Sequence, residues 1–143
     1  MVLARMIQAL GIAPGDKVLD IAGGAGYGAA LLAELGANVT ALETQATASA
    51  GPGVRAVSGA LDLGWPGSAP YDSILLHGAV ARAPTALVAQ LRDGGRLICG
   101  DCSGEVCQVV SLTRFGTGVR KKILFDAALS PLAEFAAPPE FAF

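Results

Sequence analysis

The order of apolar and polar positions predicts alternating helices and strands in the first third of the chain. Apolar residues recur every three or four positions in Val2–Leu10, which predicts an amphipathic helix. Lys17–Ala22 is apolar apart from Asp20, as is typical of a strand buried on both faces of a parallel sheet. Tyr27–Leu35 has helical spacing again, and Asn38–Leu42 follows as a second strand. This order predicts two parallel strands joined by a right-handed crossover through the helix.

The middle of the chain extends the predicted sheet. Its strand-like segments are Val54–Val57, Ser73–Leu76 and Arg96–Cys99. A helix over Pro84–Leu91 joins the last two, and Asp93-Gly94-Gly95 turns the chain back. The stretch Thr44–Gly53 occupies the place of a crossover helix but has room for barely two turns, so we expect an abbreviated helix there.

The last third of the chain has a different pattern. Val106–Thr113 and Arg120–Leu124 look like strands, and the glycine-containing link between them is short enough for a hairpin. About six residues separate Cys99 from Val106, which is too few for a crossover helix. The Pro-rich tail, Ser130–Phe143, is expected to lie over the surface. We therefore predict an α/β fold: a Rossmann-like, mainly parallel sheet with helices on both faces and an antiparallel hairpin at the C-terminal edge.

Composition narrows the class of protein. The chain has 143 residues, 52% of them hydrophobic and 15% charged, so we expect residues 1–143 to form one compact domain. A net charge of -2 disfavours a nucleic-acid partner, and no apolar run approaches the roughly 20 residues that cross a bilayer. Without a recognisable signal peptide, we expect a cytoplasmic protein. Cys99, Cys102 and Cys107 are then expected to be reduced thiols, and because no fourth ligand is evident we predict no metal site.

The segment VLDIAGGAGYG, residues 18 to 28, is the main candidate for a binding site. Its four glycines lie within six positions at a strand-to-helix turn, where a ligand can approach the backbone and the free N–H groups of the helix. Glu43 ends the next strand, about 20 residues on, where a carboxylate accepts hydrogen bonds from ribose hydroxyls.

Two ligands compete for this arrangement. The pattern Gly24-x-Gly26-x-x-Ala29 can be fitted to a dinucleotide fingerprint, but Asp20 would then oppose the charge of a pyrophosphate. S-adenosylmethionine has an ammonium group, a sulfonium and a single carboxylate, so Asp20 favours the methyl donor. A purely structural alternative is that Asp20 binds backbone N–H groups of the glycine loop.

Several longer segments resemble the protein-L-isoaspartate O-methyltransferase family, whose members are class I S-adenosylmethionine-dependent methyltransferases. They are VLARMIQALGIAPGDKVLDIAGGAGYGAALLAELGANVTALE, GWPGSAPYDSILLHGAV, APTALVAQLRDGGRLI and ILFDAALSPL. The resemblance implies that Ala22–Gly26 surround the methionine end of the cofactor, Glu43 binds its ribose, Ser58–Leu61 border its adenine, and His77 faces the reacting centre. The cofactor-binding residues expected in this way are Asp20, Ala22, Gly23, Gly24, Ala25, Gly26, Glu43, Thr44, Gly59, Ala60, Leu61 and His77.

The resemblance also implies an activity: methyl transfer to the carboxylate of L-isoaspartyl residues in damaged proteins or peptides, for their repair. A carboxylate is already a competent nucleophile, so the reaction needs no general base and we assign no catalytic residue. The chain departs from the family in having Ala22 where a glycine is usual and Ala60 where an acid is common. It also starts where the cofactor-binding half begins, so the alternative is a non-catalytic module that lacks the N-terminal segment closing the substrate site.

Three further side chains have two interpretations each. His77, the single histidine, either contacts substrate or is a hydrogen-bonded structural residue, and the structural role is the commoner one. Trp65 either covers the adenine side of the pocket or packs in the core. Asp72, which precedes a buried strand, is expected to stabilise a turn rather than to reach the site.

Overall fold

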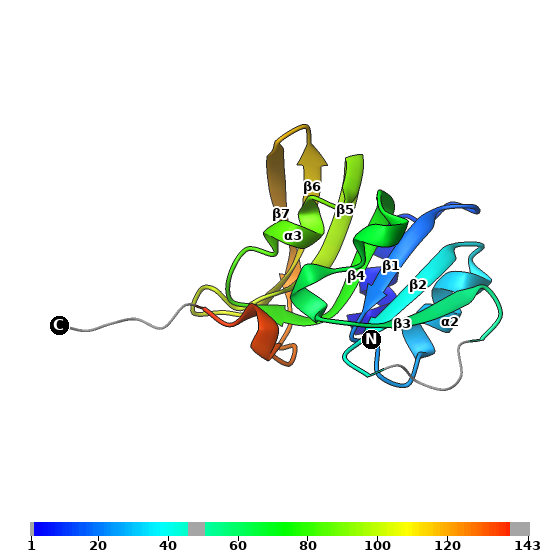
Figure 1. Ribbon diagram of the computed structural model, residues 1–143. Coiled ribbons are helices and arrows are strands. Elements are labelled where there is room, and N and C mark those ends of the chain that lie inside the picture. Colours follow the sequence, from blue (N-terminus) through cyan, green and yellow to red (C-terminus); the bar gives the residue numbers. More distant parts are fainter. Residues whose placement is uncertain (1, 46–50, 138–143) are drawn as a thin grey trace.

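A seven-stranded sheet forms the centre of the computed structural model, which describes residues 2–45 and 51–137 (Figure 1). The strands are β1 (Lys17–Ile21), β2 (Asn38–Glu43), β3 (Val54–Ser58), β4 (Tyr71–Val80), β5 (Leu91–Asp101), β6 (Gln108–Phe115) and β7 (Gly118–Asp126). The helices are α1 (Val2–Leu10), α2 (Tyr27–Glu34) and α3 (Thr85–Val88), with short 3-10 turns η1 (Leu61–Leu63), η2 (Pro66–Ser68) and η3 (Ala133–Phe135). The first strand, helix and second strand thus lie where the hydrophobic pattern predicted them.

The strand order is β3-β2-β1-β4-β5-β6-β7. The pairs among β1 to β5 are parallel, whereas β6 is antiparallel to both β5 and β7. This confirms the predicted Rossmann-like, mainly parallel sheet with an antiparallel hairpin at its C-terminal edge. The chain builds outward from β1 in one direction and from β4 in the other, so the carboxyl ends of β1 and β4 are the topological switch point of the sheet, the place where ligands bind in open α/β sheets.

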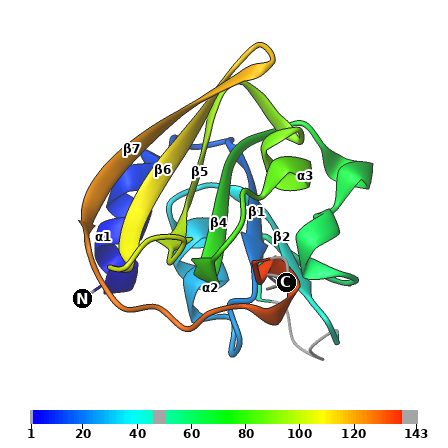
Figure 2. The same cartoon turned by 90° about the vertical axis from the view of Figure 1, so that its left-hand side faces the viewer.

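Helices cover the two faces of the sheet unequally. Figure 2 shows α1 and α3 on opposite sides of the central strands. Met6 and Leu10 of α1 and Leu32 of α2 pack with Val18 and Ile98 on one face. On the other face the core is closed by α3 and the 3-10 turns, and it holds mainly aliphatic side chains together with the fully buried Tyr71 and Phe135. No helix of the described residues is long and apolar enough to cross a membrane.

Two predicted elements between β4 and β6 differ from the structure. The helix predicted over Pro84–Leu91 is limited to the four residues of α3, because Leu91 already pairs with Tyr71 as the first residue of β5. The predicted turn at Asp93-Gly94-Gly95 is an irregularity inside β5: between two consecutive pairs, β4 advances from Tyr71 to Ser73 while β5 advances from Leu91 to Arg96. The abbreviated helix predicted in Thr44–Gly53 falls largely on residues 46–50, outside the described residues.

The C-terminal segment belongs to the core rather than only to the surface. The N–H of Ala79 donates to the carbonyl of Ser130 at 2.9 Å, and the N–H of Leu132 donates to the carbonyl of Ala79 at 3.0 Å. A Cβ at Gly78 would lie 2.6 Å from Cγ of Leu132, so a glycine there makes room for this close approach. Phe135 is completely buried. Of the described tail residues 130–137, Phe135 alone is buried, so the tail does lie over the surface as predicted, but the prediction missed its pairing with Ala79 and the burial of Phe135. Residues 138–143 lie outside the described part.

The prediction that all three cysteines are reduced is also wrong. Cys102 and Cys107 form a disulfide, with 4.3 Å between their Cα atoms. The reason lies in the antiparallel pairing, since Asp101 is the register partner of Gln108 and the short loop between β5 and β6 thus brings its two ends together. Cys99 is free and buried. Among the described residues, no group of three or more histidine, cysteine or acidic side chains could hold a metal ion.

Candidate functional site

The glycine loop between β1 and α2 has the backbone conformation that its glycines allow. Gly24 and Gly26 have φ values of 65° and 85°, in the left-handed region where a side chain is disfavoured. Ala22 also lies there, with φ of 62°, as the single described non-glycine residue with positive φ. An alanine in this region is strained by about 1–2 kcal/mol. The alanine that stands where the family usually has a glycine therefore lies at a position that favours glycine.

Glu43 joins the glycine loop to the end of β2. Its Oε1 accepts a hydrogen bond of 2.8 Å from the N–H of Gly24, and its carbonyl accepts one of 2.9 Å from the N–H of Gly59. The loop, Glu43 and the segment after β3 are thus brought together, as predicted from sequence. Thr44 and Ala60 are exposed beside them, whereas Leu61 is 5% exposed and its side chain packs in the core.

Asp20, at the end of β1, forms a buried pair with His77 of β4. Nε2 of His77 lies 2.5 Å from Oδ1 of Asp20, and the two side chains are 17% and 1% exposed. Among the hydrogen bonds of the described residues, Asp20 binds no backbone N–H of the loop, which speaks against the capping alternative. Histidine is thus the partner of this acid, and this hydrogen-bonded role agrees with the structural interpretation of His77.

The Asp20–His77 pair leaves no room for a side chain at two glycine positions. A Cβ at Gly23 would lie 2.6 Å from Oδ2 of Asp20, and a Cβ at Gly28 would lie 2.6 Å from Cε1 of His77. Gly28 is buried in the first turn of α2, and glycine is a poorer helix former than alanine, by up to about 1 kcal/mol. Sequence reasoning attributed the glycines to ligand approach alone. The unusual place of Gly28 within a helix was the available indication that a neighbouring side chain needed the space.

Trp65 lies beside Gly59, one of the residues predicted to border the adenine. The Trp65 ring packs against the core beside Gly59, where a Cβ would be 3.8 Å from Cζ3, so its place is consistent with both interpretations made from sequence.

Asp72 stands at the beginning of β4, at the opposite end of the strand from His77. It accepts hydrogen bonds from the N–H of Lys17 at 2.8 Å and from Nε of Arg92 at 2.6 Å. Desolvation alone would raise the pKa of Asp72, but these bonds and the two positive charges outweigh it and lower the pKa. Asp72 is structural.

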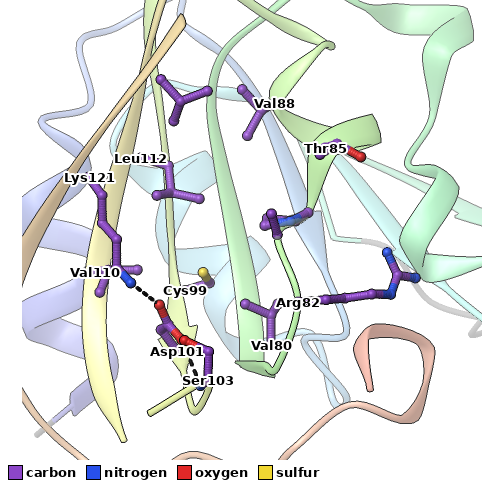
Figure 3. A pocket seen from close by; sticks show the side chains of 13 residues that line it. Val80, Arg82, Thr85, Val88, Cys99, Asp101, Ser103, Val110, Leu112 and Lys121 are labelled. Carbon is purple, nitrogen blue, oxygen red and sulfur yellow. Dashed lines mark hydrogen bonds and ion pairs between the residues drawn. The ribbon is translucent and has the colours of Figure 1, made fainter. Parts of the chain in front are cut away.

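A cavity of about 340 Å³ lies elsewhere, over β5, β6 and β7 beside α3 (Figure 3). Val88, Val110 and Leu112 give it apolar walls, and Lys121 points to Asp101 at the end near the carboxyl edge of the sheet. Desolvation opposes ionisation of Asp101, but hydrogen bonds from Lys121 and Ser103 lower its pKa.

Cys99 lines the same cavity, and burial raises the pKa of its thiol to about 12, so it stays protonated. The sequence did not predict this cavity, because its lining residues form no recognisable motif.

Comparison with known proteins gives one consistent result. The family model for protein-L-isoaspartate(D-aspartate) O-methyltransferase matches residues 1–116. A protein-L-isoaspartate O-methyltransferase from Methylorubrum populi is 40% identical over 126 residues, covering 80% of this chain and 58% of the relative. One from Rhodopseudomonas palustris is 36% identical over 143 residues, covering 92% of this chain and 66% of the relative. The chain thus spans less than two thirds of the length of these relatives.

Solved structures show the same fold. A protein-L-isoaspartate O-methyltransferase superposes with a TM-score of 0.80 at 20% identity, covering 94% of this chain and 48% of that one. A methyltransferase from Thiobacillus denitrificans, solved with S-adenosyl-L-homocysteine, superposes with a TM-score of 0.54 at 22% identity. The match covers 68% of this chain and 46% of the Thiobacillus chain. At these identities, the likeness establishes the fold.

Proposed function

The chain belongs to the protein-L-isoaspartate O-methyltransferase family, and from this premise we propose that it binds S-adenosyl-L-methionine at the glycine loop and methylates the carboxylate of L-isoaspartyl residues in damaged proteins or peptides. The cofactor would be held by the loop from Ala22 to Gly26, with Asp20 near its cationic end and Glu43 at its ribose. Gly59 and Ala60 would border the adenine through their backbone.

The charge around the loop is the observation that carries this proposal. Two carboxylates, Asp20 and Glu43, flank the loop, and within residues 2–45 and 51–137 neither forms an ion pair with a lysine or arginine. Two carboxylates beside the loop attract a ligand with an ammonium and a sulfonium and repel a pyrophosphate. A Cβ at Gly24 or Gly26 would meet nothing within 4 Å, so the backbone is open to a ligand on that side. These residues fit the proposed cofactor.

The chemistry asks little of the protein beyond binding and orientation. S-adenosylmethionine supplies an activated methyl group, and the acceptor is a carboxylate oxygen that is already nucleophilic. Holding the two reactants in line and excluding water then accounts for most of the acceleration. The methyl ester formed on an isoaspartyl residue decays through a succinimide, which permits repair of the backbone. No side chain of the described residues is needed as a general base in this scheme.

The test is transfer of a tritiated methyl group from S-adenosylmethionine to an isoaspartyl peptide, compared with the same peptide containing ordinary aspartate. We expect a base-labile product from the isoaspartyl peptide alone. Binding of S-adenosylmethionine without transfer would support the alternative, a module that binds the cofactor but does not catalyse. Titration with NAD serves as the negative control, and tight binding of NAD with none of S-adenosylmethionine would refute the cofactor assignment.

Glu43 provides the matched variants. We expect Glu43→Ala to weaken S-adenosylmethionine binding by about 1–3 kcal/mol, because hydroxyl groups of the ribose and the N–H of Gly24 would lose their acceptor. Glu43→Gln retains an oxygen acceptor and should lose less. Glu105→Ala, at an exposed residue of the loop between β5 and β6, should leave the dissociation constant unchanged. Equal dissociation constants for Glu43→Ala and Glu105→Ala would refute the ribose assignment.

A further inference from the structure

A buried carboxylate needs a hydrogen-bond donor, and Asp20 has one. Asp20 is 1% exposed, at the end of β1 beside the glycine loop. Taking a carboxylate out of water without compensation is costly, so such groups are normally paired or take up a proton. The described residues leave no buried side-chain polar atom without a partner, and the partner of Asp20 is His77. An ionised carboxylate can only accept hydrogen bonds, so the tautomer of His77 that fits this pair is the one with the proton on Nε2.

The surroundings hold both side chains in one orientation. Oδ1 of Asp20 faces His77 at 2.5 Å, while Oδ2 lies where a Cβ of Gly23 would be, at 2.6 Å. The imidazole of His77 lies against Gly28 of α2, at 2.6 Å from a Cβ built there. Oδ2 is therefore directed under the loop that would receive the cofactor. The two glycines make this arrangement possible, because a larger residue at either position would displace the pair.

From this geometry we propose that His77 is a positioning residue: its hydrogen bond holds the Asp20 carboxylate directed at the loop, so that the protein binds the cationic methyl donor in preference to its neutral by-product. The inference rests on the proposed cofactor. S-adenosylmethionine and S-adenosylhomocysteine share the adenosine, the ammonium and the carboxylate, and they differ in the methyl group and the positive charge at sulfur. A fixed negative charge near that sulfur distinguishes the two, whereas contacts to the shared parts do not.

The role of His77 makes a prediction that a structural role does not. Without the donor, no side chain holds the Asp20 carboxylate in its orientation under the loop, and the charge that distinguishes the ligands is no longer fixed beside the sulfur. His77→Leu should therefore act on the preference for S-adenosylmethionine much as Asp20→Asn does. His77→Gln places an amide N–H near the position of Nε2 and should preserve the preference. A histidine that merely packs the core would, on removal, weaken both ligands by the same factor.

The experiment is calorimetric titration of the 143-residue protein and these three variants with S-adenosylmethionine and, separately, S-adenosylhomocysteine at one fixed pH. We expect the ratio of the two dissociation constants to shift about tenfold toward the neutral by-product in Asp20→Asn and in His77→Leu. His77→Gln should stay within about threefold of the unaltered protein. Thermal unfolding of each variant identifies loss of the folded state, and His77→Gln is the substitution that the site should tolerate best.

The possible outcomes separate this inference from the proposed function. If both ligands bind and His77→Leu shifts both constants equally, the inference is overturned while the proposed function stands. If neither ligand binds the unaltered protein, the proposed function and the inference fail together. If His77→Leu does not fold, the other two variants test the proposal. An unchanged ratio of the two dissociation constants in Asp20→Asn would overturn the positioning role. Loss of the preference for S-adenosylmethionine in His77→Gln would overturn it as well.

Discussion

The switch point at the carboxyl ends of β1 and β4 (the crevice of open α/β sheets) and the cavity over β5, β6 and β7 are built in opposite ways. In the crevice, Asp20 and His77 fill their space so closely that neither Gly23 nor Gly28 could carry a Cβ without displacing them. In the cavity, about 340 Å³ stays open between α3 and the hairpin, with buried Val110 and half-exposed Val119 on its walls. Both lie on the same sheet, so the sheet itself does not explain the difference.

Connectivity explains it. Each parallel strand requires a crossover, and the crossovers cover the faces of the sheet, as α2 does between β1 and β2. The antiparallel β6 and β7 are joined by a tight turn, which brings no helix with it. Among the described residues, the four-residue α3 and the loop before it border the cavity on one face of the hairpin. Side chains of the parallel strands pack against helices, whereas those on this face of the hairpin border an open cavity.

Adding one methyl group to the crevice should have the largest effect. Gly28→Ala places a Cβ 2.6 Å from Cε1 of His77, and we expect a loss of about 2 kcal/mol in the free energy of unfolding. Helix propensity alone predicts the opposite sign, a gain of about 1 kcal/mol. Urea denaturation measures the difference. The double variant with His77→Ala should recover part of the loss through a coupling between the two positions, and a stabilised Gly28→Ala would show that the crevice is not closely packed.

Removing a methyl group from the same loop should have a smaller and favourable effect. Ala22→Gly relieves a left-handed residue of φ 62°, and we expect a gain of about 1 kcal/mol in the free energy of unfolding. The neighbouring Ala25 is the matched control, since its φ is not positive and Ala25→Gly should lose stability through the greater entropy of the unfolded chain. Both are measured by denaturant titration. If the two substitutions change stability equally, the strain at Ala22 is refuted.

The parallel half could be predicted from sequence because its information is local. Val18, Leu19 and Ile21 are completely buried, as a continuously apolar strand implies. Glycines followed by a helix, with an acid at the end of the next strand, predicted the position of the loop and of Glu43, although not the hydrogen bond between Glu43 and Gly24. Each of these inferences depends on residues that are near one another in the chain or on the regular geometry of a crossover.

What could not be predicted depends on contacts between distant positions. Asp20 and His77 are 57 residues apart, and only the parallel register that sets Ile21 beside Leu76 brings them together. The short α3 follows from the pairing of Tyr71 with Leu91, which overrides the helical pattern of Pro84–Leu91. The cavity results from a helix that the hairpin does not provide, and a missing element leaves no motif in the sequence.

The ion pair in the cavity should show a modest dependence on pH. The pKa of Asp101 is lowered from its usual 3.8, since its hydrogen bonds outweigh desolvation. Its contribution to stability is therefore present above pH 3.8 and is lost as the pH falls through the lowered pKa of the folded state. Because Lys121 is 46% exposed, we expect Asp101→Asn to lose about 0.5–1 kcal/mol at neutral pH, with the gap to the unaltered protein closing in acid. Unfolding titrations across pH measure it, with Glu105→Gln as an exposed control; a gap that widens in acid would contradict the sign.

The smallest expected effect comes from the same substitution, valine to isoleucine, made once in each region. Val110→Ile adds a methyl group beside the cavity, where Val110 is 1% exposed, and we expect a gain of about 0.5 kcal/mol from extra apolar burial. Val18→Ile makes the same change in β1, where α1 and α2 already pack against the fully buried side chain. There we expect a loss of about 1 kcal/mol from overpacking. Opposite signs in denaturant unfolding would show that the hairpin face has usable space, whereas losses at both positions would show that the cavity walls are as rigid as the crevice.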